Sequence, residues 1–164
     1  MVGAWAWLVI VVAVSAGAIA RQEDAPAPRF TEVYQAGEAG FHTFRIPSLL
    51  PARNGTLLAF AEARREGAAD AGDIDLVLKR SRDGGASWSP LQVIGDDGAN
   101  TVGNPCPVVD GTTGTIWLLT TRNRGADRER DIIAGTSQGT RTVWVQRAPT
   151  TATTGRRQSR SPPA

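Results

Sequence analysis

The chain has 164 residues, of which 41% are hydrophobic, 21% charged and 6% aromatic, and this ordinary composition excludes collagen-like, coiled-coil and wholly disordered proteins. One cysteine, Cys106, and one histidine, His42, exclude an internal disulfide framework and the usual zinc sites. The net charge of +2 arises in the last 18 residues, which hold four arginines and no acid, so residues 1–146 carry a net charge of −2. Nucleic acid is therefore not an expected partner.

The amino terminus resembles a targeting segment. Residues 4–14 are uninterruptedly apolar, and the small residues that follow end in Ala18-Ile19-Ala20. This pattern predicts a secretory signal peptide over residues 1–20, with Arg21 starting the mature chain. No Lys or Arg precedes the apolar run, which leaves a retained signal anchor as the second interpretation and a buried core helix as the third. We expect export, without membrane attachment unless the segment is retained.

The rest of the chain has the pattern of a β protein. After a Pro-rich leader (21–40), short apolar runs alternate with Gly, Asn and Asp turns. The predicted strands are residues 43–50, 56–62, 75–81, 91–94, 107–109, 115–121 and 140–146, with one possible helix at 125–137. This spacing indicates an all-β sandwich, barrel or propeller and does not choose among them. Cys106 is expected to be a small buried apolar side chain.

The segment Ser81–Trp88, with sequence SRDGGASW, is a candidate structural turn. The Asp83 carboxylate can accept hydrogen bonds from backbone N–H groups of its own turn, while Gly85 tolerates a positive φ and Trp88 can pack beneath the hairpin. With Ser81, these residues resemble the Asp box of sialidase propeller blades. The alternative is an ordinary Gly-rich turn. The resemblance assigns them structural roles, not catalytic ones.

Three further segments extend the resemblance to the sialidase family. Phe44–Pro47 reads FRIP, Leu57–Arg64 reads LLAFAEAR, and Gly103–Pro107 reads GNPCP. Together with the turn, they follow one another in the order of that family. The resemblance covers residues 41–146. It implies a six-bladed β-propeller of which this chain supplies about the first two to three blades.

The resemblance also assigns substrate-binding residues. Arg45 and Arg64 match the first two of three arginines that bind the carboxylate of sialic acid, and a guanidinium suits that task because it stays charged and offers a planar fork. Without the family context, each arginine could simply cover apolar surface or pair with an acid. Glu62 and Asn104 match positions near the sugar, with a plain strand or loop role open for both.

A glycosidase also needs a carboxylic acid that protonates the leaving oxygen, usually with a raised pKa. Asp70, Asp73 and Asp75 are the candidates. The resemblance favours Asp70, in a Gly- and Ala-rich loop after Arg64, with Asp73 as runner-up; a solvated acidic loop is the alternative. The mixed-charge run at 127–131 is interpreted as solvated, with a minor prospect of lining a pocket wall.

The implied function is that of an exo-α-sialidase, which releases terminal sialic acids from glycoproteins, glycolipids or oligosaccharides without a metal or organic cofactor. Such enzymes use a tyrosine nucleophile, and the one tyrosine here, Tyr34, precedes the FRIP segment. We therefore expect the chain to be inactive alone. Its tail, residues 147–164, is expected to be disordered and to result from an altered reading frame. The alternatives are a non-catalytic carbohydrate-binding or scaffolding fragment and an exported module whose arginine tail binds acidic polymers.

Overall fold

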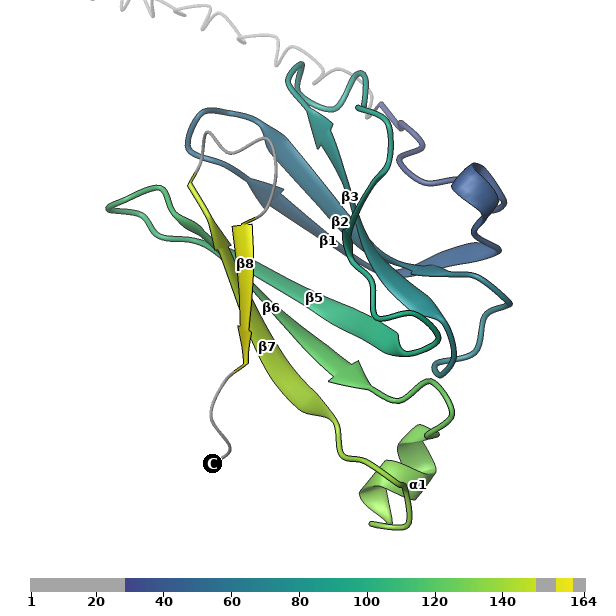
Figure 1. The fold of residues 1–164 in the computed structure, drawn as a ribbon. Coiled ribbons are helices and arrows are strands. Elements are labelled where there is room, and N and C mark those ends of the chain that lie inside the picture. The colour runs from purple at the N-terminus through teal and green to yellow at the C-terminus, as the bar shows by residue number, and fades with distance from the viewer. Residues whose placement is uncertain (1–28, 150–155, 161–164) are drawn as a thin grey trace, which may run out of the picture.

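The computed structural model describes residues 29–149 and 156–160 (Figure 1). The elements in chain order are η1 (Glu38–Gly40), β1 (Thr43–Pro51), β2 (Leu57–Arg64), β3 (Ile74–Ser81), β4 (Gln92–Gly95), β5 (Thr101–Val109), β6 (Ile116–Asn123), α1 (Glu129–Ile133), β7 (Thr142–Ala148) and β8 (Arg156–Arg160). The chain is therefore an all-β protein with two short helical segments in its described part. The expected signal peptide lies outside the described residues.

Over residues 29–149 and 156–160, no helix is both long enough and apolar enough to cross a bilayer.

The strands form two antiparallel groups in chain order. Strands β1 to β4 pair successively in the first group, and β5 to β8 pair successively in the second. The groups are joined by one parallel bridge, Ile74 with Thr101. Figure 1 shows β1–β3 and β5–β7 fanning apart. Helix α1 lies at one end of the molecule, in the segment that connects β6 to β7.

The main core lies between the two groups. It combines large apolar side chains of β2 and β3, such as Phe60 and Leu76, with Val102 of β5 and Leu118 of β6. A second, smaller cluster forms on the other face of β2 and β3, around Phe41 and Val77. Because both clusters pack on β2 and β3, these two strands are buried on both faces along most of their length.

The leader residues before β1 belong to the fold. The Tyr34 ring stacks on Phe44 at a centroid distance of 5.0 Å, and its hydroxyl donates to the Ala59 carbonyl at 2.6 Å. Lys79, which is mostly buried on β3, donates to the Val33 carbonyl at 2.8 Å and pairs with Glu38 at 2.6 Å. These contacts fix the leader across the outer face of β2 and β3.

One expected strand start and one expected burial are wrong. Strand β5 begins at Thr101 rather than at residue 107, since a bulge between Gly103 and Cys106 lets the strand continue through Pro105. The same register places Cys106 opposite Leu119 on an exposed face, so the expected burial of this thiol is also wrong.

Part of the tail is described by the structure, and residues 150–155 and 161–164 lie outside the described residues. Strand β7 extends to Ala148, and residues 156–160 form β8, which pairs antiparallel with β7. A strand at a sheet edge is held by backbone hydrogen bonds to its neighbour and does not require large apolar side chains. The polar composition of the tail therefore did not exclude a strand.

Candidate functional site

The site begins where the inward face of β2 turns from apolar to polar. Leu58, Phe60, Glu62 and Arg64 share one face by strand alternation, and the first two belong to the main core. Glu62 and Arg64 continue the same row to the end of the strand, where Arg45 of β1 lies opposite Glu62. One strand therefore carries both the core and the charged residues, in sequence.

Two bulges re-aim the neighbouring strands at this point. In β1 the register shifts after Arg45, and Ile46 has φ 51°; in β5 it shifts after Gly103, and Asn104 has φ 53°. Positive φ is uncommon for Asn and strained for a β-branched residue such as Ile46. Each strained residue immediately precedes a proline. Bulges near functional sites commonly redirect side chains in this way.

Glu62 joins the two strand groups beneath the site. Its Oε1 accepts the Asn104 backbone N–H at 2.9 Å, and its Oε2 accepts Arg64 Nη2 at 2.6 Å. The Glu62 side chain is about 5% exposed. A Cβ added to Gly103 would lie 2.3 Å from Glu62 Oε1, so the close approach requires glycine. Asn104 uses its side-chain amide to donate to Thr121 Oγ1 at 2.8 Å.

Arg64 fastens the loop between β2 and β3. Its side chain is only 3% exposed, and its Nη1 donates to the carbonyls of Ala68 at 2.6 Å and Ala69 at 2.7 Å. The same nitrogen lies 2.8 Å from Asp70 Oδ1. Arg45 Nη1 reaches that oxygen at 3.0 Å and the Ala68 carbonyl at 3.2 Å. The structure thus brings Arg45, Arg64 and Asp70 together.

The Asp70 carboxyl is held in its charged form. The hydrogen bond from Arg64 and the positive charges of Arg64, Arg45 and Arg141 lower the pKa of Asp70 below its usual value. This is the reverse of the raised pKa expected of an acid catalyst. The reason is that, in this state, the carboxylate sits against guanidinium groups rather than in an apolar pocket.

The other two carboxylates of the loop region lie elsewhere. Asp75 is fully buried on the outer face of β3, where Arg65 Nη2 contacts its Oδ2 at 2.6 Å. Asp73 pairs with the same arginine at 3.3 Å. Burial, followed by the charge of Asp96, raises the pKa of Asp75 to about 6. The raised pKa of Asp75 therefore results from its burial on the face of the sheet opposite Glu62 and Arg64, away from the site.

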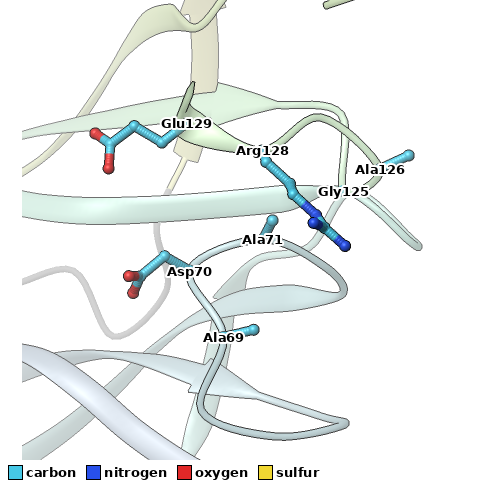
Figure 2. Close-up of a pocket in the computed structure, with 7 residues that line it drawn as sticks. All are labelled: Ala69, Asp70, Ala71, Gly125, Ala126, Arg128 and Glu129. Atoms are coloured by element: carbon cyan, nitrogen blue, oxygen red, sulfur yellow. The ribbon is translucent and has the colours of Figure 1, made fainter. Parts of the chain in front are cut away.

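A cleft of about 480 Å³ opens beside Asp70. Figure 2 shows the carboxylates of Asp70 and Glu129 pointing the same way from opposite walls, while the Arg128 side chain extends toward the other end. The cleft is lined by Ala69, Asp70, Ala71, Gly125, Ala126, Arg128 and Glu129. The mixed-charge run therefore provides one wall. Sequence reasoning gave it little weight because nothing in its composition distinguishes a pocket wall from a solvated segment.

Three loops converge to build this cleft. The Asn100 side chain accepts the Gly125 N–H at 3.2 Å, and Thr101 Oγ1 donates to the Gly72 carbonyl at 2.9 Å. Arg141 lies behind Glu129, with 3.5 Å between Nη1 and Oε1. Close backbone approach requires a glycine at position 125 of the lining, since a Cβ there would lie 2.0 Å from the Ala99 carbonyl oxygen.

The segment Ser81–Trp88 forms a tightly hydrogen-bonded turn and contributes no residue to the cleft lining. Asp83 Oδ1 accepts the Ser81 hydroxyl at 2.7 Å and the Ser87 N–H at 2.9 Å, and Ser81 Oγ accepts the Gly85 N–H at 2.8 Å. Hydrogen bonds from Ser87 and Ser81 hold the pKa of the Asp83 carboxyl well below its usual range. Gly85 has φ 93° and lies against Leu57 and the Trp88 ring.

Two sequence relatives match half or more of this chain. A protein named exo-alpha-sialidase from Arthroderma benhamiae is 36% identical over 144 residues, which cover 74% of this chain and 35% of that protein. A second exo-alpha-sialidase, from Aspergillus fumigatus, is 48% identical over 90 residues, covering 51% of this chain and 22% of that protein. The chain thus spans about a third or less of the length of these relatives.

Comparison of folds and of family patterns agrees with these relatives. The solved structure titled Hadza microbial sialidase Hz136 superposes with a TM-score of 0.67 at 25% identity, covering 76% of this chain and 27% of that one. The family pattern of the BNR repeat-like domain matches residues 46–161, more than half of the chain. The chain therefore belongs to the BNR repeat-like domain family and has sialidases among its homologues.

Proposed function

We propose that this chain is part of an exo-α-sialidase that releases terminal sialic acids from glycoproteins, glycolipids or oligosaccharides. The observation that carries the proposal is the convergence of Arg45 and Arg64 on one carboxylate oxygen, at 3.0 and 2.8 Å. Two guanidinium groups in this arrangement suit a substrate whose reacting carbon bears a carboxylate. The homologues named exo-alpha-sialidase support the assignment.

The proposed roles combine the family resemblance with the arrangement of these side chains. Arg45 and Arg64 bind the substrate carboxylate, and Asp70 donates a proton to the leaving oxygen from the edge of the cleft. Asn104 presents its side chain near the sugar from the β5 bulge. Glu62, with both oxygens engaged and little exposure, contributes by holding Arg64 and the Asn104 backbone in place.

The fold proposal is a six-bladed β-propeller, of which this chain contributes the first blades. Two successive antiparallel groups, β1–β4 and β5–β8, support it, because a propeller blade is a four-stranded antiparallel sheet that packs face to face on its neighbour. The turn at Ser81–Trp88 then serves as an Asp box. We also propose that residues 1–20 direct export; amino-terminal sequencing of secreted protein should find Arg21 first.

Binding of N-acetylneuraminic acid to the chain tests the carboxylate site. Arg45→Ala should weaken binding at least tenfold, because a charge-assisted hydrogen bond to the ligand is lost. The matched control is Arg53→Ala, which removes an exposed arginine from the turn between β1 and β2; this arginine donates to the Thr112 carbonyl in the turn between β5 and β6. Saturation-transfer NMR measures both. Equal affinity of the two variants would refute the assignment of Arg45.

One observation favours binding without turnover for the polypeptide taken alone. Tyr34, its one tyrosine, packs against the cluster on the outer face of β2, away from the face that carries Glu62 and Arg64. Burial raises the pKa of Tyr34 above its usual value, which disfavours the phenolate. Arg45 and Arg64 can therefore bind the substrate and Asp70 can serve as the acid. The one tyrosine of this sequence does not reach the cleft to act as a nucleophile.

A further inference from the structure

Asp70 occupies the position that the arginine pair offers to a ligand carboxylate. Its Oδ1 is within 3.0 Å of Arg45 Nη1 and 2.8 Å of Arg64 Nη1. The Asp70 side chain is 64% exposed and that of Arg45 45% exposed, whereas Arg64 is almost fully buried. Asp70 and Arg45 are both largely open to solvent, and an ion pair between two such groups gains little stability in water.

We propose that Asp70 is an internal carboxylate that fills the Arg45–Arg64 pair until the carboxylate of a ligand displaces it. The inference rests on the proposed function, in that it takes this pair to be the carboxylate-binding site. It goes further by giving Asp70 a role before any chemistry: the residue competes with the ligand and must leave the arginines for the ligand to enter.

The hydrogen bonds of Arg64 allow this exchange at low cost. Arg64 Nη1 carries two N–H groups but has three acceptors within 2.8 Å, namely two loop carbonyls and Asp70. When Asp70 departs, the carbonyls of Ala68 and Ala69 still satisfy both N–H groups. Neither N–H group of Arg64 Nη1 is then left without an acceptor, and the loop backbone stays bound to Arg64.

The cleft provides room for the displaced side chain. Its lining next to Asp70 consists of small residues, Ala69, Ala71, Gly125 and Ala126. Figure 2 shows the Asp70 side chain at the edge of this space, on a loop whose neighbours carry only methyl groups. A rotation of the Asp70 side chain is therefore enough to exchange its partners, without movement of β2 or β3.

The exchange would also change the protonation of Asp70, which must carry a proton in order to act as a proton donor. While it contacts the arginines, their hydrogen bond and charges hold the pKa of Asp70 below its usual value. A ligand carboxylate that takes over the arginines removes these contacts and adds a nearby negative charge, and both changes favour the protonated form of Asp70. Only a substrate that bears a carboxylate prepares the acid in this way.

The test compares ligand affinities of the intact chain and its Asp70→Asn variant. Removing an internal competitor raises apparent affinity by the reciprocal of the vacant fraction of the site. We expect Asp70→Asn to bind N-acetylneuraminic acid about fivefold more tightly, and a simple carboxylate, pyruvate, by a similar factor. Chemical-shift changes of the Arg45 guanidinium ¹⁵N signals during titration give the dissociation constants, and Asp70→Ala serves as a second variant.

Glu129→Gln is the matched control, because it removes a carboxylate charge from the opposite wall of the same cleft without touching the arginine pair. Its affinities should change less than twofold. Tighter binding of pyruvate alone by the Asp70 variants would uphold the displacement and reject the sialidase assignment. Unchanged affinity for both probes, or an equal gain in Glu129→Gln, would overturn the proposal, the latter by showing a general effect of charge.

Discussion

Two carboxylates five positions apart in the sequence, Asp70 and Asp75, have opposite proton affinities in this fold. Asp70 is exposed and lies against Arg64 and Arg45, which favour the carboxylate. Asp75 is fully buried and has one arginine partner, Arg65, which does not offset the loss of hydration. The contrast shows that proton affinity near this loop is determined by the face to which a side chain turns.

Asp75 should make the protein less stable as the pH rises. Its pKa is about 6 when folded and near 3.8 when unfolded, so the folded chain binds more protons between these values. The free energy of unfolding should therefore fall by about 2 to 3 kcal/mol from pH 4 to pH 7 on account of this group.

The Asp75→Asn variant tests this dependence, because it keeps an acceptor for Arg65 without a titrating group. Urea denaturation of both proteins at pH 4, 5, 6 and 7 gives the slopes. The variant should lack the decline attributed to Asp75, and parallel slopes for variant and parent would contradict the expectation.

Gly103 should be intolerant of a side chain. In Gly103→Ala the added Cβ would lie 2.3 Å from Glu62 Oε1, and the displaced carboxylate would lose its contacts with Arg64 and the Asn104 backbone. We expect a loss of about 1 to 3 kcal/mol in the free energy of unfolding, as for other overpacked sites. Gly111→Ala is the control, since nothing lies within 4 Å of its Cβ position. Equal stability of the two variants would show that Glu62 can move without cost.

At the scale of the element, β2 and the turn after β3 perform separable tasks. The inward row of β2 carries apolar packing at one end and Glu62 with Arg64 at the other. The turn from Ser81 to Trp88 closes the hairpin between β3 and β4 and contacts Leu57 at the start of β2. Changes in the turn should therefore affect local order more than the arginine pair.

Asp83→Ala should open that turn. The variant loses the acceptor of the Ser81 hydroxyl and of both Ser87 donors. We expect faster hydrogen exchange of the Ser87 amide by at least tenfold, with the Arg45 guanidinium signals unchanged. Arg82→Ala alters an exposed residue in the same turn and should leave the Ser87 amide protected. Equal exchange rates in both variants would rule out the assigned role of Asp83.

The sequence predicted the bounds of the regular strands β2 and β3 well, and the bounds of the bulged strand β5 poorly. The strands predicted at 56–62 and 75–81 lie within two residues of β2 and β3, because their apolar residues and flanking turn residues follow the period of a strand. The first half of β5 was not predicted as strand because Gly103 and Pro105 are typical of a strand end. In the structure these residues flank Asn104, the bulge residue with a positive φ. The contact of Asp70 with Arg45 spans 25 residues, and no local pattern encodes such a contact.

At the scale of the whole molecule, the site depends on contact between the two strand groups. They share one parallel bridge in the backbone, so the core between them and the Glu62 contact to Asn104 maintain their relative placement. The cleft lies at the same junction, with Asp70 from the first group and Glu129 from the segment after β6. An intact cleft therefore requires both groups to be folded.

The polypeptide should bind sialosides without hydrolysing them. A retaining glycosidase needs a nucleophile, and Tyr34 is hydrogen-bonded to Ala59 on the outer face of β2. The loss of a nucleophile removes orders of magnitude of rate. A fluorogenic sialoside incubated with residues 21–164 should show no turnover above a buffer blank. Turnover that disappears in Asp70→Ala would demonstrate a complete catalytic centre and contradict the expectation.

The shared row of β2 has a consequence for insertions and deletions in the gene. Adding one residue between Phe60 and Glu62 would rotate Glu62 and Arg64 to the outer face and bring Ala61 and Ala63 inward. The charged groups of Glu62 and Arg64 would then face the apolar cluster around Phe41 and Val77. Their burial there opposes pairing of the strand in the shifted register. A one-residue insertion here should therefore lower the stability of the whole sheet, in addition to removing Arg64 from the site.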